Sequence, residues 1–128
     1  MKVTILTFAA LAALFFSGCT TPVAIDPLTG QEQTAEYRVG TFYAPLDAPI
    51  GEIFRVAIRE MDAMGYFRTG ELHREDSISI YARTVGDKKV KVQAAQSEEG
   101  GSEIRIRIGR FGDLAESQTL YARIRNAL

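Results

Sequence analysis

The sequence predicts an α+β fold in which two helices cover one face of an antiparallel sheet. Three segments in the second half of the chain alternate apolar and polar residues, as strands with one buried face do. Two other segments repeat apolar residues at helical spacing, which indicates helices that pack on that sheet. The expected order is β-α-β-β-β-β-α, a two-layer sandwich with about five strands.

The composition is that of a single domain. The chain has 128 residues, of which 46% are hydrophobic and 24% are charged, and its formal net charge is -1. The balance of 15 basic and 16 acidic residues gives no overall field that would attract nucleic acid, so we expect no nucleic-acid partner. The single cysteine, Cys19, excludes a disulfide framework and a cysteine-rich zinc module.

The N-terminus has the organisation of a secretory signal peptide. One basic residue, Lys2, precedes an apolar run over residues 3–16, and small residues follow that run. The run is shorter than the roughly 20 apolar residues that a membrane-spanning helix needs. We therefore expect residues 1–18 to be a signal peptide.

The end of this run, Phe16-Ser17-Gly18-Cys19, resembles the lipobox of bacterial lipoproteins, in which leucine, a small residue and glycine or alanine precede the modified cysteine. Phe16 replaces the usual leucine and keeps an apolar side chain. The resemblance implies that the Cys19 thiol is lipidated and that acyl chains anchor the protein in a membrane. Thr20 stands where an aspartate would signal inner-membrane retention, which implies an outer-membrane location facing the periplasm. The alternative is that Cys19 is an ordinary small residue after a signal peptide.

A flexible tether is expected between this anchor and the folded domain. Residues 19–35 contain two prolines and a glycine and show neither a helical nor an alternating period. A flexible chain of this length reaches about 20 to 25 Å, which would hold the domain close to the bilayer. The single α+β domain is then expected over residues 36–128.

The domain is predicted to begin with a strand over residues 36–43, which are rich in aromatic and β-branched residues. A helix follows, with Asp47 as its expected N-cap and Gly65 at its expected end. Its apolar residues recur at helical spacing and are expected to face the sheet. These residues are Ile50, Ile53, Phe54, Ala57, Met61 and Met64.

Four further strands are predicted after this helix. Residues 67–74 form a plausible short strand, although Gly70 weakens the pattern. Residues 77–84, 88–95 and 104–108 alternate strictly and are separated by short turns. These three segments predict an antiparallel meander with one buried face.

A tight turn and a second helix close the chain. Gly109 to Gly112 is expected to be the turn, with Phe111 packed onto the core. Asp113 is expected to begin the helix and to form a capping box with Glu116. The apolar stripe of this helix is expected to face the sheet. It consists of Leu114, Ser117, Leu120, Tyr121, Ile124 and Leu128.

The ending GSEIRIRIGRFGDLAESQTLYARIRNAL, together with the lipobox and the segment EYRVG, resembles a family of small bacterial lipoproteins known as domain of unknown function 3568. The most specific element of the resemblance is a Gly-x-Phe-Gly-Asp turn, whose positions are held here by Gly109, Phe111, Gly112 and Asp113. The resemblance covers most of the chain after the signal peptide. It implies the fold and the envelope location, and it implies no catalytic residue.

The sequence shows no catalytic or metal-binding constellation. His73 is the only histidine, and no HExxH, GxSxG or Cys/His pairing accompanies it. The acidic pairs at 75–76 and 98–99 fall in expected turns and lack the spaced oxygen ligands of a calcium loop. We expect a protein that is not an enzyme and that uses no metal or cofactor. The alternative is a small periplasmic enzyme with its site between the helices and the sheet.

The outer face of the meander is the candidate binding face. Six residues, five of them cationic, are expected to project from the side of the sheet that faces away from both helices. They are Tyr81, Arg83, Lys89, Lys91, Arg105 and Arg107. Such a face could recognise an envelope protein or an anionic polymer. The alternatives are a solvated face whose cations discourage aggregation, and a self-assembling component that pairs through its sheet.

Overall fold

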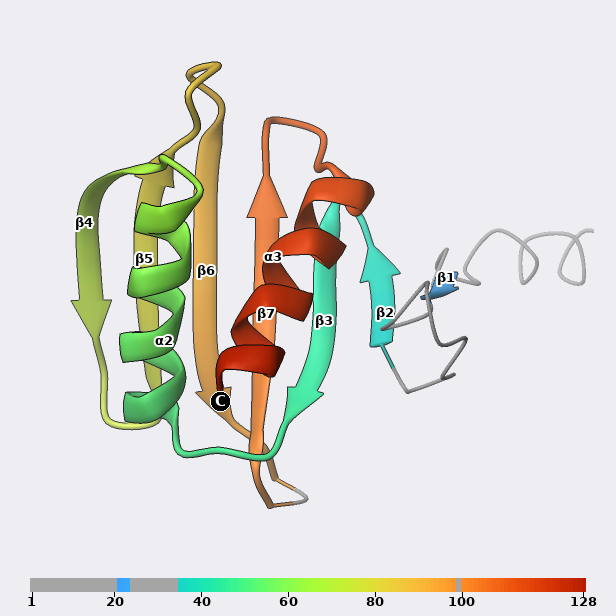
Figure 1. The fold of residues 1–128 in the computed structure, drawn as a ribbon. Coiled ribbons are helices and arrows are strands. Elements are labelled where there is room, and N and C mark those ends of the chain that lie inside the picture. The colour runs from blue at the N-terminus through green and yellow to red at the C-terminus, as the bar shows by residue number, and fades with distance from the viewer. Residues whose placement is uncertain (1–20, 24–34, 99) are drawn as a thin grey trace, which may run out of the picture.

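One antiparallel sheet carries two helices on one of its faces (Figure 1). The computed structural model describes residues 21–23, 35–98 and 100–128. Within these ranges the sheet has seven strands in the order β1-β2-β3-β7-β6-β5-β4. The α+β class and the two helices on one face are therefore confirmed, whereas the expected number of strands was too low. The expected signal peptide and Cys19 lie outside the described residues.

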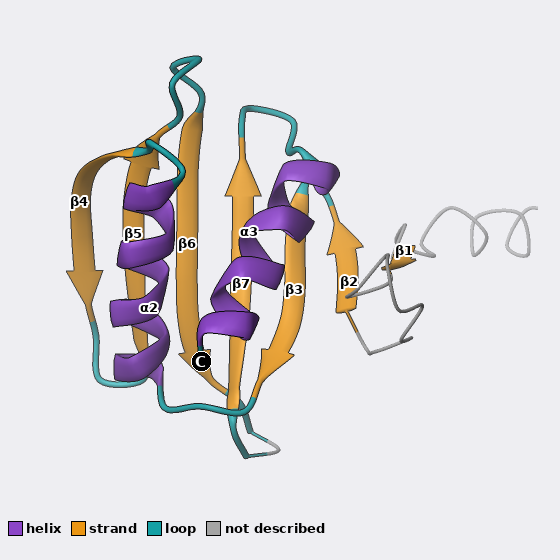
Figure 2. Cartoon of the chain, in the orientation of Figure 1, coloured by secondary structure: helices purple, strands orange, loops and turns teal. Residues whose placement is uncertain are grey.

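The sheet pairs an early strand with the last strand of the chain (Figure 2). The strands β3 and β7 are neighbours, although α2 and three strands separate them in the sequence. The bounds are β1 (Thr21–Val23), β2 (Ala35–Arg38), β3 (Thr41–Leu46), α2 (Ile50–Ala63), β4 (Phe67–His73), β5 (Ser77–Arg83), β6 (Lys89–Gln96), β7 (Ser102–Ile108) and α3 (Leu114–Ala127).

The prediction of one strand over residues 36–43 is wrong, because this segment is a hairpin. Val39 and Gly40 form a two-residue turn between β2 and β3, and both have positive φ, 49° and 79°. Positive φ at both central residues is the geometry of a type I′ turn, which suits the twist of a hairpin. A β-branched residue such as Val39 rarely adopts this conformation, so the sequence carried no ordinary turn signal.

Strand β1 is the other addition to the expected sheet. Thr21–Val23 fall within the segment expected to be a tether, and they pair antiparallel with β2. Thr21 lies opposite Tyr37, and Val23 lies opposite Ala35. Ala35 is buried, so this residue already contributes to the core.

The expected meander is confirmed, with β4, β5, β6 and β7 pairing in succession. The register between β4 and β5 shifts between Arg68 and Gly70, which marks a β-bulge at the glycine that weakened the strand pattern. Every residue of β4 is exposed, as befits the strand at the edge of the sheet.

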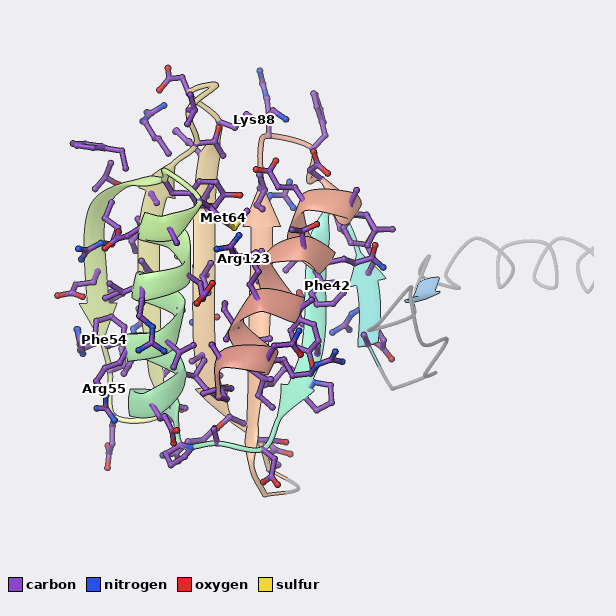
Figure 3. All side chains as sticks on the ribbon, in the orientation of Figure 1. Phe42, Phe54, Arg55, Met64, Lys88 and Arg123 are labelled. Atoms are coloured by element: carbon purple, nitrogen blue, oxygen red, sulfur yellow. The ribbon has the colours of Figure 1, made fainter. Side chains whose placement is uncertain are left out.

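The core fills the layer between the sheet and the helices. Alternate residues of the central strands are buried there, and Phe42 of β3 packs against Tyr121 of α3 with ring centroids 5.3 Å apart (Figure 3). The Tyr121 hydroxyl donates a hydrogen bond to the Pro45 carbonyl at 2.9 Å. Between the helices, the Arg123 Nε donates to the Glu60 Oε2 at 2.9 Å.

Neither α2 nor α3, the helices of the described ranges, is long and apolar enough to cross a membrane.

The first helix keeps its expected stripe and end but not its expected cap. Ile53, Ala57 and Met61 are buried, and the helix ends before Gly65, which has a φ of 79°. The residues Ile50, Phe54 and Met64 are partly buried against the core, and Val56 is buried in addition.

The N-cap of α2 is Pro49 and not Asp47, and no side chain caps this end. The carbonyl of Pro49 accepts the first helical hydrogen bonds, from the amides of Glu52 and Ile53, both at 3.1 Å. Asp47 lies two residues too early to reach these amides, and it is exposed.

The second helix begins as expected, because the Asp113 Oδ1 accepts a hydrogen bond from the Glu116 amide at 3.0 Å. The Glu116 carboxylate accepts a hydrogen bond from the Tyr66 hydroxyl at 2.6 Å, so this side chain joins α3 to the segment after α2. The prediction that Leu128 is buried is wrong. Leu128 follows the last turn of the helix and is 40% exposed.

The prediction that Phe111 packs onto the core is also wrong, because its ring is 83% exposed. The backbone of this turn, rather than the Phe111 ring, packs against the hairpin turn. A Cβ added to Gly40 would lie 2.6 Å from the Phe111 carbonyl oxygen, and a Cβ added to Gly112 would overlap the Gly40 carbonyl and the Tyr37 hydroxyl. The turn between β2 and β3 and the turn between β7 and α3 therefore meet backbone to backbone through two glycines.

We predict that Gly112→Ala lowers the free energy of unfolding by at least about 2 kcal/mol, because it adds both a steric overlap and an L side chain at a φ of 83°. Urea unfolding followed by circular dichroism would measure the change. Gly70→Ala is the control, because no atom lies within 4 Å of its added Cβ and its φ is not positive. Equal stability of the two variants would contradict the close approach of the turns.

Candidate functional site

The structure places the six residues of the candidate binding face on the side of the sheet away from the helices. Tyr81 lies opposite Lys91, which lies opposite Arg107 on the next strand. Arg83 lies opposite Lys89 in the same way. Directly opposed residues of neighbouring strands project from the same face. The residues that alternate with them, such as Val92, are buried under the helices.

A shallow groove of about 260 Å³ crosses this face over β3, β7 and β6. We call it the outer groove. Three of the six candidate residues line it, together with three residues that the sequence analysis did not single out. Its lining consists of Thr41, Tyr43, Lys91, Gln93, Arg105 and Arg107.

Tyr43 is the aromatic residue of the outer groove that the sequence analysis missed. The Arg38 guanidinium lies 4.2 Å from the centre of the Tyr43 ring, and the Arg105 guanidinium lies 5.8 Å from it. Cations over an aromatic face are attracted by the ring quadrupole. Tyr43 reaches the groove only because β3 pairs with β7, a long-range pairing that alternation along one segment does not reveal.

Arg105 forms an ion pair and a hydrogen bond with neighbouring side chains. Its Nε donates to the Glu103 Oε1 at 2.7 Å, and its Nη1 donates to the Gln93 Oε1 at 3.4 Å. The Glu103 side chain is partly exposed, so solvent screens this ion pair. The Arg105 guanidinium therefore keeps access to a ligand in the groove.

Arg107 has a structural role that its position on the face did not reveal. Its Nη1 donates to the Val39 carbonyl in the hairpin turn, and its Nη2 donates to the Arg110 carbonyl at 2.7 Å. One guanidinium thus joins the two turns that meet at Gly40 and Gly112. Its planar fork of donors suits this bridging of two acceptors.

The remaining cations of the face differ in whether they form an ion pair. The Arg83 Nη1 pairs with the Asp87 Oδ1 at 3.1 Å. The Lys91 ammonium lies 5.9 Å from the centre of the Tyr81 ring. Lys89 and Lys91 are exposed and have no ion pair within the described part of the chain. The face therefore presents its accessible positive charge mainly through these two lysines and Arg105.

Beyond Tyr43 the same face becomes acidic. A wider depression of about 470 Å³ adjoins the outer groove there, and Glu36, Asp47 and Glu103 are among its lining residues. The Glu36 carboxylate lies 3.5 Å from the Arg38 Nε. Acidic residues thus gather beyond Tyr43, and two of them, Glu36 and Glu103, pair with the neighbouring Arg38 and Arg105.

The sequence matches the family described as "Protein of unknown function (DUF3568)" over residues 2–127. The chain belongs to the DUF3568 family. No curated protein matches the chain. In this DUF3568 protein, the Gly-x-Phe-Gly-Asp turn that carried the resemblance brings Gly112 against the hairpin and provides Asp113 as the cap of α3.

The buried titratable groups of this DUF3568 protein support its fold. Burial, reinforced by the hydrogen bond to Glu116, raises the pKa of Tyr66 far above its usual value. Burial also raises the pKa of Tyr121. His73 is exposed at the end of β4, with its Nε2 3.5 Å from the Glu71 Oε2 and its ring edge-on to Phe54. No group of three His, Cys, Asp or Glu residues in the described ranges could hold a metal ion.

We predict that Arg107→Ala lowers the free energy of unfolding by about 1 to 3 kcal/mol, because the carbonyls of two turns lose a charged donor. Arg105→Ala is the matched control on the same strand, and it should cost less than about 1 kcal/mol because its partner is a screened carboxylate. Chemical unfolding of both variants checks the difference. A smaller loss for Arg107→Ala than for Arg105→Ala would refute the bridging role.

Proposed function

We propose that this protein is a membrane-anchored lipoprotein of the bacterial envelope that binds an anionic partner through its outer sheet face. The lipobox-like segment before Cys19, the only cysteine in the chain, supports the anchor. The proposed location is the outer membrane, facing the periplasm. The partner is an envelope protein or polymer that presents carboxylates or phosphates.

The outer groove is the observation that carries the binding role. Lys91 and Arg105 provide positive charge along it, and Gln93 lies opposite Arg105 on the strand that carries Lys91. The hydroxyls of Thr41 and Tyr43 add hydrogen-bonding groups at the other side of the groove. At about 260 Å³ the groove is below the usual size of a pocket for a drug-sized ligand. A carboxylate or phosphate borne on a larger partner suits it better.

The chemistry of the groove supports binding rather than catalysis. Its lining contains neither a carboxylate nor a histidine that could act as a general acid or base. Its cations and hydroxyls would instead pair with negative charge that a partner brings. Exposed complementary charge of this kind mainly increases the rate and specificity of association.

We predict that the double variant Lys91→Glu, Arg105→Glu reduces capture of the partner at least about tenfold, because two favourable charge contacts become repulsive. A photoreactive residue at Gln93, inside the groove, would measure capture in intact cells. Arg55→Glu, Arg59→Glu is the matched control, because these two exposed cations lie on α2, which covers the other face of the sheet (Figure 1). Equal capture by both variants would exclude the outer groove as the site.

We predict that Cys19→Ser abolishes lipidation and either releases the protein from the membrane fraction or leaves its precursor unprocessed, because serine has no thiol to accept the lipid. Intact-mass spectrometry and detergent phase partitioning would detect the change. Thr20→Ser is the control, since it alters the neighbouring residue and keeps the thiol. An identical mass increment on the Cys19→Ser protein would contradict the assignment of the anchor.

A further inference from the structure

The most exposed large apolar side chains of the described residues gather at one end of the sheet. Val39, Val85 and Phe111 are 90%, 86% and 83% exposed, and Phe67 is 72% exposed. Single exposed apolar residues are common on soluble proteins, but a cluster of them marks an interaction surface. We call these four residues the apolar end.

The strand registers show that the four residues share this end. Val85 lies in the turn between Arg83 and Lys89, which oppose each other, and Phe67 opposes Arg83. On the other half of the sheet, the turns that hold Val39 and Phe111 contact each other through their backbones. The Gly109 amide donates to the Lys89 carbonyl at 2.8 Å and joins the two halves. Figure 1 shows the turns β2–β3, β5–β6 and β7–α3 at the same end of the molecule.

The apolar end carries more positive than negative charges. Lys89 and Arg110 lie between the apolar side chains along the same turns, and neither has an ion pair in the described part of the chain. Lys88, Arg68 and Arg83 lie there too, and each pairs with an aspartate. Unpaired cations beside exposed aromatic and aliphatic tips form the pattern of a surface that contacts anionic lipid headgroups.

The opposite end of the sheet lacks this character. Its turns carry Asp47, Glu75, Asp76 and Glu98, all exposed, with Arg74 as the only cation among the described turn residues. None of these turns exposes a large apolar side chain within the described residues. The domain is therefore polarised along its strands, with a positive apolar end and an acidic polar end.

The chain enters the sheet at the apolar end. Thr21, the first residue of β1, lies opposite Tyr37, two residues before Val39 of the hairpin turn. Cys19 precedes Thr21 by two residues in the sequence, so the backbone between them spans at most about 7 Å. An anchor at Cys19 would therefore bring this end, and not the acidic end, to the bilayer.

We propose that the apolar end docks onto the membrane surface, with Val39, Phe67, Val85 and Phe111 inserted among the lipids and with Lys89 and Arg110 against the phosphates of anionic headgroups. This inference rests on the membrane anchorage of the proposed function, and it adds an orientation. The strands then stand on the bilayer, the acidic end points away from it, and the outer groove opens sideways, where a partner can reach it.

A tryptophan reporter tests this orientation, because the chain contains no tryptophan. Phe111→Trp places the reporter at the apolar end, and Leu72→Trp places a matched one near the opposite end, where Leu72 is 41% exposed. The full chain would be reconstituted in vesicles of brominated phosphatidylcholine and phosphatidylglycerol. We expect bromine to reduce the emission of the Phe111→Trp protein at least twofold, and to leave the emission of the Leu72→Trp protein nearly unchanged. Equal quenching of both proteins, or quenching of neither, would overturn the docking.

A second comparison tests the headgroup contact. Lys89→Glu, Arg110→Glu in the Phe111→Trp background should reduce quenching in vesicles with phosphatidylglycerol, and quenching that is unaffected by the two changes would overturn the electrostatic part of the proposal. The assay uses the unprocessed full chain, which keeps the apolar run at residues 3–16 and so can associate with vesicles without acylation of Cys19. Failure of the anchor would therefore appear in the mass of the protein, and failure of docking in its fluorescence.

Discussion

The close approach of two turns, with Arg107 between them, is the constraint on which the rest of the structure depends. One turn belongs to the N-terminal hairpin and the other leads from the last strand into the last helix. Their contact requires glycine at positions 40 and 112, and the Arg107 guanidinium satisfies carbonyls on both sides. This contact holds β3 beside β7 and determines where α3 begins over the sheet. The turn that carried the family resemblance thus connects two distant parts of the chain.

The sequence predicted what depends on local periodicity. The alternation of β5, β6 and β7 revealed the meander, and Gly65 and Asp113 marked the end of one helix and the start of the other. It did not predict what depends on distant contacts. The turn at Val39 is unfavourable for an isolated β-branched residue, and it is stabilised by Arg107 from another strand. A tight turn with the Phe111 ring on the core is what the sequence favours, whereas the turn packs through its backbone and leaves the ring exposed.

For the candidate site too, the sequence predicted what depends on local periodicity and missed what depends on distant contacts. Alternation indicates which residues share a face, and the six predicted residues do share one. Alternation does not reveal their partners, so it treated Arg107, which holds turns together, and Lys91, which is accessible, as equivalent. It also could not include Tyr43, because the strand that carries this residue joins the face through a pairing between the two ends of the chain. The accessible cations of the face are therefore fewer than the sequence indicated, and one of them, Arg105, lies beside the ring of Tyr43.

The bulge at Gly70 affects whether the edge strand β4 can pair with a second chain. Strand β4 is fully exposed at this edge, and a regular strand there would offer a template for a second chain. The shift between Arg68 and Gly70 breaks the regular spacing of its hydrogen-bonding groups, and Arg68, Glu71 and His73 add charge or polarity along it. The irregularity that weakened the strand pattern thus makes this edge a poorer template for pairing with a second chain.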